Sequence, residues 1–173
     1  MRGLLIFLVF VPLTLLASTK LQDEHRLGVQ YFHQKQYQKA FELWTKTSTQ
    51  GHAASTHNLG QLYYFGLGVP KDYVAAFTLY KSAAQQGELK SIAQVGYLYY
   101  TGRGTAQDYS AALKWLKKAA KKGSKIGQHY LGHAYSNGNG VKIDREKAAF
   151  WHEKAAAAGD SNSQYMMGWM YFH

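Results

Sequence analysis

Histidines are the side chains in this sequence with the most obvious capacity for chemistry. His129 and His133 are four residues apart, so a helix would place both imidazoles on one face, and His57 holds the position of His129 in another segment. Three imidazoles could hold a zinc ion. However, no Glu follows His129 to act as a base, and Ala93 and Tyr97 replace the pair in the segment between. A zinc-dependent hydrolase is therefore a weaker alternative, and we expect no metal and no cofactor.

Other catalytic arrangements lack their essential residues. The sequence has no Cys, which removes thiol nucleophiles, thiolate metal sites and disulfides. Its Ser and Thr residues are scattered, and no glycine loop has the spacing that binds phosphate. A pair of catalytic carboxylates is also disfavoured, because Asp72, Asp108 and Asp144 recur at a fixed interval, as helix caps do. These patterns favour a protein that is not an enzyme.

A repeat of 36 residues is the strongest pattern in the chain, and it must build the elements that position these side chains. Four glycines mark it: Gly60, Gly96, Gly132 and Gly168. Small and apolar residues between the markers have helical spacing, so each unit predicts two helices, A and B. Helix A is expected to end at a double-glycine stretch such as Gly66 to Gly68, and helix B at Gly87 or its equivalents.

The marker glycine falls inside helix A, where it costs about 1 kcal/mol relative to Ala. Close packing against helix B, which carries pairs of Ala residues, would offset this cost. We expect Tyr63, Trp115 and Trp151 to fill the remaining volume. Leucine in place of Gly96 is therefore expected to overpack this contact.

The repeat resembles the Sel-one-like repeat, a relative of the tetratricopeptide repeat, in Leu59-Gly60, Tyr63, Gly66-Leu67-Gly68-Val69, Asp72, Ala75-Ala76, Tyr80, Ala83-Ala84 and Gly87. The resemblance covers residues 53–88, 89–124 and 125–160, with a half repeat at 161–173 as a capping helix. Residues 22–51 lack the double glycine and look like an ordinary tetratricopeptide-like hairpin. The resemblance implies an all-α fold, a right-handed α/α superhelix (solenoid) of stacked helix-turn-helix repeats.

The same resemblance implies a function. It is that of an adaptor, since members occur in membrane-associated quality control, in bacterial envelope assemblies and in host contact, and it implies no one reaction. A cysteine-rich branch has been described as β-lactam-binding or β-lactam-hydrolysing. That activity is not carried over to a chain without Cys.

In tetratricopeptide-like stacks the A helices line the concave face, at positions three before, one after and four after the helix glycine. These positions predict a partner-binding stripe of His57, Gln61, Tyr64, Tyr97, Tyr100, His129, His133, Tyr165, Trp169 and Phe172, preceded by His25, Val29 and Phe32. Aromatic rings with polar tips dominate binding hot spots, so a protein or extended peptide is the expected partner. The alternative is that Tyr97, Tyr100 and Tyr165 only pack between neighbouring A helices.

A second candidate surface is basic. Six lysines lie at helical spacing on the outward side of the second B helix: Lys114, Lys117, Lys118, Lys121, Lys122 and Lys125. They form either an ordinary solvated face or a site for an anionic membrane surface or an acidic glycan. A nucleic-acid partner is disfavoured, because no aromatic residue alternates with these lysines.

The start of the sequence predicts export. Residues 1–18 have the charged start, short apolar middle and small-residue end of a signal peptide. An uncleaved membrane anchor is the alternative, but the apolar run is short for a span of about 20 residues. Without this leader the chain carries 19 Lys and Arg against 10 Asp and Glu, which favours an acidic partner. We therefore expect a bacterial periplasmic or secreted scaffold.

Overall fold

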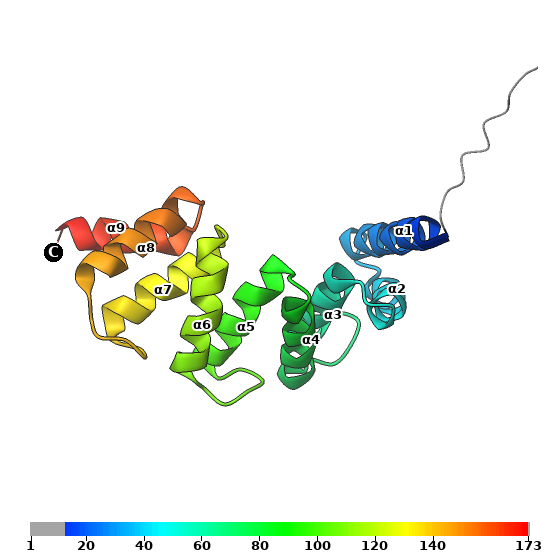
Figure 1. The fold of residues 1–173 in the computed structure, drawn as a ribbon, viewed down its shortest axis with the longest axis horizontal. Coiled ribbons are helices and arrows are strands. Elements are labelled where there is room, and N and C mark those ends of the chain that lie inside the picture. The colour runs from blue at the N-terminus through cyan, green and yellow to red at the C-terminus, as the bar shows by residue number, and fades with distance from the viewer. Residues whose placement is uncertain (1–12, 173) are drawn as a thin grey trace, which may run out of the picture.

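A computed structural model describes residues 13–172, with side chains described for residues 18–167. This part of the chain forms nine α-helices: α1 (Leu13–His33), α2 (Tyr37–Thr49), α3 (Ala53–Phe65), α4 (Tyr73–Gln85), α5 (Leu89–Thr101), α6 (Tyr109–Lys121), α7 (Lys125–Asn137), α8 (Arg145–Ala157) and α9 (Ser161–Phe172). Each helix packs against the next, and together they make a curved row (Figure 1). The architecture is therefore the all-α, right-handed α/α superhelix of stacked helix-turn-helix repeats, with odd-numbered A helices and even-numbered B helices.

The repeated Asp and Gly residues begin and end the helices as predicted. Asp72, Asp108 and Asp144 are the N-caps of α4, α6 and α8, and each carboxylate accepts hydrogen bonds from backbone N–H groups of the first turn. The first glycine of each double-glycine loop ends an A helix in the left-handed conformation: Gly66, Gly102 and Gly138. Repeat length is thus encoded by local backbone requirements at both ends of each loop.

The cap of α6 gives a direct test of this local encoding. Asp108 accepts from the backbone N–H of Ala111 at 2.9 Å. We expect Asp108→Ala to lower the free energy of unfolding by about 1 kcal/mol, because the open amides lose their acceptor. Urea unfolding would measure this loss. Glu153→Ala, which removes an exposed carboxylate from α8, should change stability by less than about 0.5 kcal/mol and serves as the control.

The glycines inside the A helices allow the B helices to approach closely, and the side chain that faces each glycine is one for which the sequence analysis predicted no such contact. A β-carbon built on Gly96 would lie 2.8 Å from Cγ of Leu116. The equivalent neighbours of Gly60 and Gly132 are Tyr80 and His152. Tyr63, Trp115 and Trp151 do pack against the core clusters as partly buried residues, but they are not the side chains that face the glycines. The facing residue varies in type from unit to unit, which hides it from a search for identical repeats.

The second loop glycine holds neighbouring units together. A β-carbon on Gly104 would collide with the backbone carbonyl of Tyr73, at the start of the preceding B helix. Gly68 and Gly140 meet Tyr37 and Tyr109 in the same way. Because φ is +72° at all three glycines, a side chain would be strained as well as crowded. The loop of one unit is therefore fixed against the unit before it.

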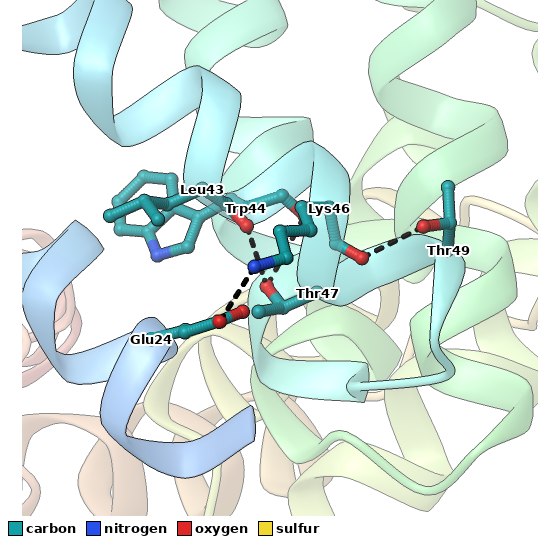
Figure 2. Close-up of polar contacts among 6 residues, drawn as sticks. All are labelled: Glu24, Leu43, Trp44, Lys46, Thr47 and Thr49. Carbon is teal, nitrogen blue, oxygen red and sulfur yellow. Dashed lines mark hydrogen bonds and ion pairs between the residues drawn. The ribbon is translucent and has the colours of Figure 1, made fainter. Parts of the chain in front are cut away.

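The first unit has a shorter turn. Its helices α1 and α2 are joined by three residues, and Lys35 takes the left-handed conformation that glycine supplies elsewhere. An ion pair between Lys46 Nζ and Glu24 Oε1, at 2.7 Å, joins the two helices (Figure 2). The hydroxyl of Thr47 donates a hydrogen bond to the carbonyl oxygen of Leu43, so this buried polar group has a partner (Figure 2).

The predicted leader, residues 1–18, falls mostly on residues outside those described. Helix α1 begins at Leu13, within that segment. Across residues 13–172, no helix combines the length and apolar character needed to cross a bilayer. Cleavage of the leader stays a prediction.

Candidate partner-binding groove

Histidine and serine side chains join consecutive A helices along the row. Nδ1 of His57 in α3 lies 2.8 Å from Oγ of Ser91 in α5, and nearly the same contact joins His25 to Ser55 and His129 to Ser163. The exception lies between α5 and α7, where Ala93 and Gly127 occupy the equivalent positions. Where the histidine is absent, the serine is absent as well. This indicates that each His–Ser contact serves to connect two neighbouring units.

Two of the predicted binding residues that make these contacts are buried. His57 is 3% exposed and His129 is 8% exposed. Both imidazoles are therefore buried, whereas the sequence analysis placed them on an exposed binding stripe. Burial lowers the pKa of His57 to about 4, with Glu88 opposing the shift and Lys90 adding to it. The ring is therefore neutral at pH 7. With Nδ1 used by Ser91, the buried Nε2 of His57 has no hydrogen-bond partner in the described chain.

The histidines near α7, considered above as zinc ligands, pack against one another. His129 and His133 have ring centroids 4.6 Å apart, and His152 joins them from α8. However, Nδ1 of His129 is engaged by Ser163 and by Asp160, at 2.9 and 3.0 Å. Among the described residues no three His, Asp or Glu side chains are grouped so as to hold a metal ion. These three histidines pack against one another, and His129 is also hydrogen-bonded to residues at the start of α9.

An open cavity of about 300 Å³ lies between α1 and α3. Its apolar wall includes Val29, Phe32 and Trp44, and its polar wall includes His25, His57, Asn58 and Gln61, with Glu88 and Lys90 also contributing. All the predicted stripe positions of the first two units except Tyr64 therefore line one hollow. This hollow can take an apolar side chain while it presents polar groups to a backbone.

Three partly exposed side-chain amides on the A helices have no hydrogen-bond partner within the described chain. Asn58 and Gln61 of α3 line the cavity, and Gln94 of α5 lies one repeat after Asn58. All three are partly exposed, and none takes part in a hydrogen bond within the described chain. A primary amide offers one donor side and one acceptor side, which match the groups of a peptide backbone. Unpaired amides beside an apolar hollow suit an extended polypeptide.

The tyrosines of α3, α5 and α7 form one connected cluster. The Tyr64 and Tyr97 hydroxyls are 3.1 Å apart, and the Tyr130 ring lies 5.1 Å from that of Tyr97 and 5.2 Å from that of Tyr100. Burial, followed by the hydrogen bond with Tyr64, raises the pKa of Tyr97, so this phenol stays protonated at neutral pH. These rings pack between A helices, with the Tyr64 and Tyr97 hydroxyls close together, and partner binding by them stays a prediction.

Loop residues of the following unit reach these tyrosines. Arg103 Nη1 donates to the hydroxyls of Tyr64 and Tyr97, at 2.7 and 2.8 Å. One repeat later, Asn139 Nδ2 donates to the hydroxyl of Tyr100 at 2.6 Å. Arg103 and Asn139 each stand between the two glycines of a loop. The groove wall is therefore built partly from loops, which the helix-based prediction omitted.

The last predicted groove residues lie on α7 and α9. His133 is half-buried and stacked on His129 and His152, and burial lowers its pKa, with His129 adding to the shift. Tyr165 is 75% exposed. The side chains of Trp169 and Phe172 lie outside those described. Of the predicted stripe, Tyr64, Tyr97 and Tyr100 are joined through their hydroxyls and the Tyr130 ring, whereas Gln61 lines the cavity between α1 and α3.

The six lysines do not share one helix face. All six are exposed, but Gly123 ends α6 with φ of +83°, so Lys122 caps α6 and Lys125 begins α7. The prediction of a single B-helix face is corrected to a basic surface that continues around the α6–α7 turn. Within the described chain no carboxylate lies within ion-pair distance of any of these lysines.

The fold, a row of stacked two-helix units, is that of a helical-repeat scaffold. A family model for the Sel1 repeat matches residues 23–52, 53–88, 89–124, 126–160 and 161–173. The chain belongs to the Sel1 repeat family, whose repeats mediate protein–protein interactions.

Solved structures agree with this assignment. The chain is similar to a protective antigen of uropathogenic Escherichia coli strains that displays an SLR fold, with 32% identity and a TM-score of 0.80 over 93% of this chain and 36% of that one. It is also similar to a Sel1 repeat protein from Oxalobacter formigenes, with 30% identity and a TM-score of 0.77 over 86% of this chain and 62% of that one. The chain thus spans only part of both relatives.

A more distant likeness supports the fold alone. Cysteine-rich protein B of Helicobacter pylori has 22% identity and a TM-score of 0.51, over 62% of this chain and 92% of that one. No curated protein matches the chain significantly.

Proposed function

We propose that this chain is a non-catalytic scaffold that binds an extended polypeptide segment along its A helices. The observation that carries the proposal is the cavity between α1 and α3, together with the unpaired amides of Asn58 and Gln61 at its polar wall. An apolar side chain of the segment would enter the hollow, while the amides bind its backbone. The tyrosine cluster continues this surface toward α7.

A phage-displayed library of random 12-residue peptides provides a defined probe. Peptides selected on the full chain should bind the Asn58→Ala/Gln61→Ala double variant about tenfold more weakly, because two backbone contacts are lost. Fluorescence polarisation with the synthetic peptides would measure this. Gln85→Ala removes an exposed amide from a B helix and should leave affinity unchanged. Failure to select any peptide, or equal affinity for the double variant, would contradict groove binding.

A second function is favoured by the unpaired lysines around the α6–α7 turn. A bacterial anionic membrane or an acidic glycan would complement them. Binding to vesicles containing phosphatidylglycerol should fall steeply with ionic strength, and the Lys117→Glu/Lys121→Glu double variant should abolish it. Binding to phosphatidylcholine vesicles at the same strength would rule out this electrostatic mode.

We also propose that the protein acts outside the cytoplasm, in the periplasm or after secretion. Residues 1–18 have the pattern of a signal peptide, and a relative is described as a protective antigen. Cell fractionation with detection of the processed N-terminus tests this location.

A further inference from the structure

Arg103 is an exposed cation that the structure holds in place without a carboxylate. Its Nη1 donates to Tyr64 and Tyr97, and the guanidinium carbon lies 5.8 and 5.9 Å from the centroids of the Tyr97 and Tyr73 rings. The charged or titratable groups that act on it are these same three tyrosines. Arg103 takes part in no ion pair among the described residues. Its charge is therefore positioned but not neutralised.

The remaining polar atoms at this point are hydrogen-bond donors. Both Nη1 protons are used by the tyrosine oxygens, which leaves the protons on Nη2 and Nε. One tyrosine hydroxyl donates to the other across 3.1 Å, so the second hydroxyl keeps a proton with no acceptor in the described chain. A guanidinium edge beside a phenol proton is complementary to an oxyanion.

The backbone fixes the direction of this group. Gly102 and Gly104 flank Arg103 with φ of +70° and +72°, and Gly104 lies directly on the backbone of Tyr73. The loop cannot shift without breaking its contact with α4. Anchoring of this kind lowers the entropic cost of binding, because the side chain is ordered before the ligand arrives.

The position is specific to one junction of the array. Leu67 and Asn139 occupy the equivalent loop positions, and neither carries a charge. Arg103 therefore is not required by the repeat itself. Its neighbours Tyr64 and Tyr97 belong to the predicted groove, which places the cation on the surface proposed to bind the segment.

We propose that Arg103, with the free hydroxyl proton of the Tyr64–Tyr97 pair, binds the carboxylate of an Asp or Glu side chain in the polypeptide segment that occupies the groove. This proposal rests on the proposed function. The other source of the same chemistry, a phosphorylated side chain, is distinguished by the experiment.

The peptides selected from the 12-residue library provide the test. They should contain an Asp or Glu whose change to Asn or Gln weakens binding to the full chain about tenfold. Arg103→Gln should weaken binding by the same factor, and the two changes together should cost no more than either alone. Arg103→Lys keeps the charge but loses the planar fork, so it should restore affinity only in part. Arg145→Gln, which removes an exposed arginine from α8, should change affinity less than twofold.

The outcomes separate this proposal from the one on which it rests. Peptides that depend on Asn58 and Gln61 but bind Arg103→Gln normally would overturn the carboxylate contact and keep groove binding. Peptides that depend on neither would overturn both. Selected peptides that bind more tightly after their acidic residue is replaced by phosphoserine would also overturn the carboxylate assignment.

Discussion

Replacing Gly96 with leucine is expected to lower the free energy of unfolding by about 2 kcal/mol or more. Leucine is intrinsically better in a helix by about 0.8 kcal/mol, so propensity alone predicts the opposite sign. Packing decides the outcome, because a β-carbon would already lie 2.8 Å from the Leu116 side chain and 3.1 Å from its backbone nitrogen. Overpacking a well-filled core typically costs about 1–3 kcal/mol, and relief here requires α6 to move away from α5.

Urea unfolding of Gly96→Leu and of the wild-type chain would measure this effect. Ser110→Leu places the same side chain on an exposed position of α6 and should shift stability by less than about 0.5 kcal/mol. Gly96→Ala should give a smaller loss than leucine in the same direction. An unchanged midpoint for Gly96→Leu would show that the glycine is not needed for close helix approach.

Acidification is expected to destabilise the chain before its carboxylates titrate. Burial lowers the pKa of both His57 and His152 to about 4, and for His152 the neighbouring His133 and His129 add to the shift. Because the folded pKa lies below the unfolded value of 6.5, the unfolded chain binds protons first as the pH falls. Stability is therefore complete above pH 6.5 and declines toward pH 4, by roughly 2 kcal/mol per histidine at pH 5.

Urea unfolding at pH 7.5 and pH 5.0 provides the measurement. The His57→Gln/His152→Gln double variant should lose stability at pH 7.5 because it disturbs buried contacts, but its difference between the two pH values should shrink. His25, His52 and His133 also have lowered pKa values, mainly from burial, and would retain part of the slope. Equal stability of the wild-type chain at the two pH values would refute the effect.

The sequence was sufficient to predict the fold because its glycines and aspartates act locally. A left-handed helix end favours glycine, as at Gly66, and the open amides of a first turn favour aspartate, as at Asp108. The residue type alone therefore indicates where each helix begins or ends. The packing against the glycine was not predictable in the same way. Tyr80, Leu116 and His152 fill equivalent spaces with different shapes, and only the facing helix shows which residue does so.

The surroundings of the candidate site residues were predictable only in part, for a related physical reason. Gln61, Tyr64 and Tyr97 follow from the helix register, but that register does not show whether a polar side chain meets solvent or the next unit. The serines opposite His57 and His129 lie 34 residues downstream, and this recurring offset is the signal that could have revealed their burial. Arg103 was missed because it stands on a loop rather than on a helix face.

The contact between each double-glycine loop and the unit before it has a consequence for how this array can change. Leu67, Arg103 and Asn139 each contribute to a surface whose other half belongs to the preceding unit: an apolar cluster for Leu67 and tyrosine hydroxyls for the other two. The side chains that meet at each boundary therefore depend on which two units are neighbours. Duplicating or moving a single 36-residue unit would bring different side chains together at its two boundaries, although the sequence of every helix would stay the same.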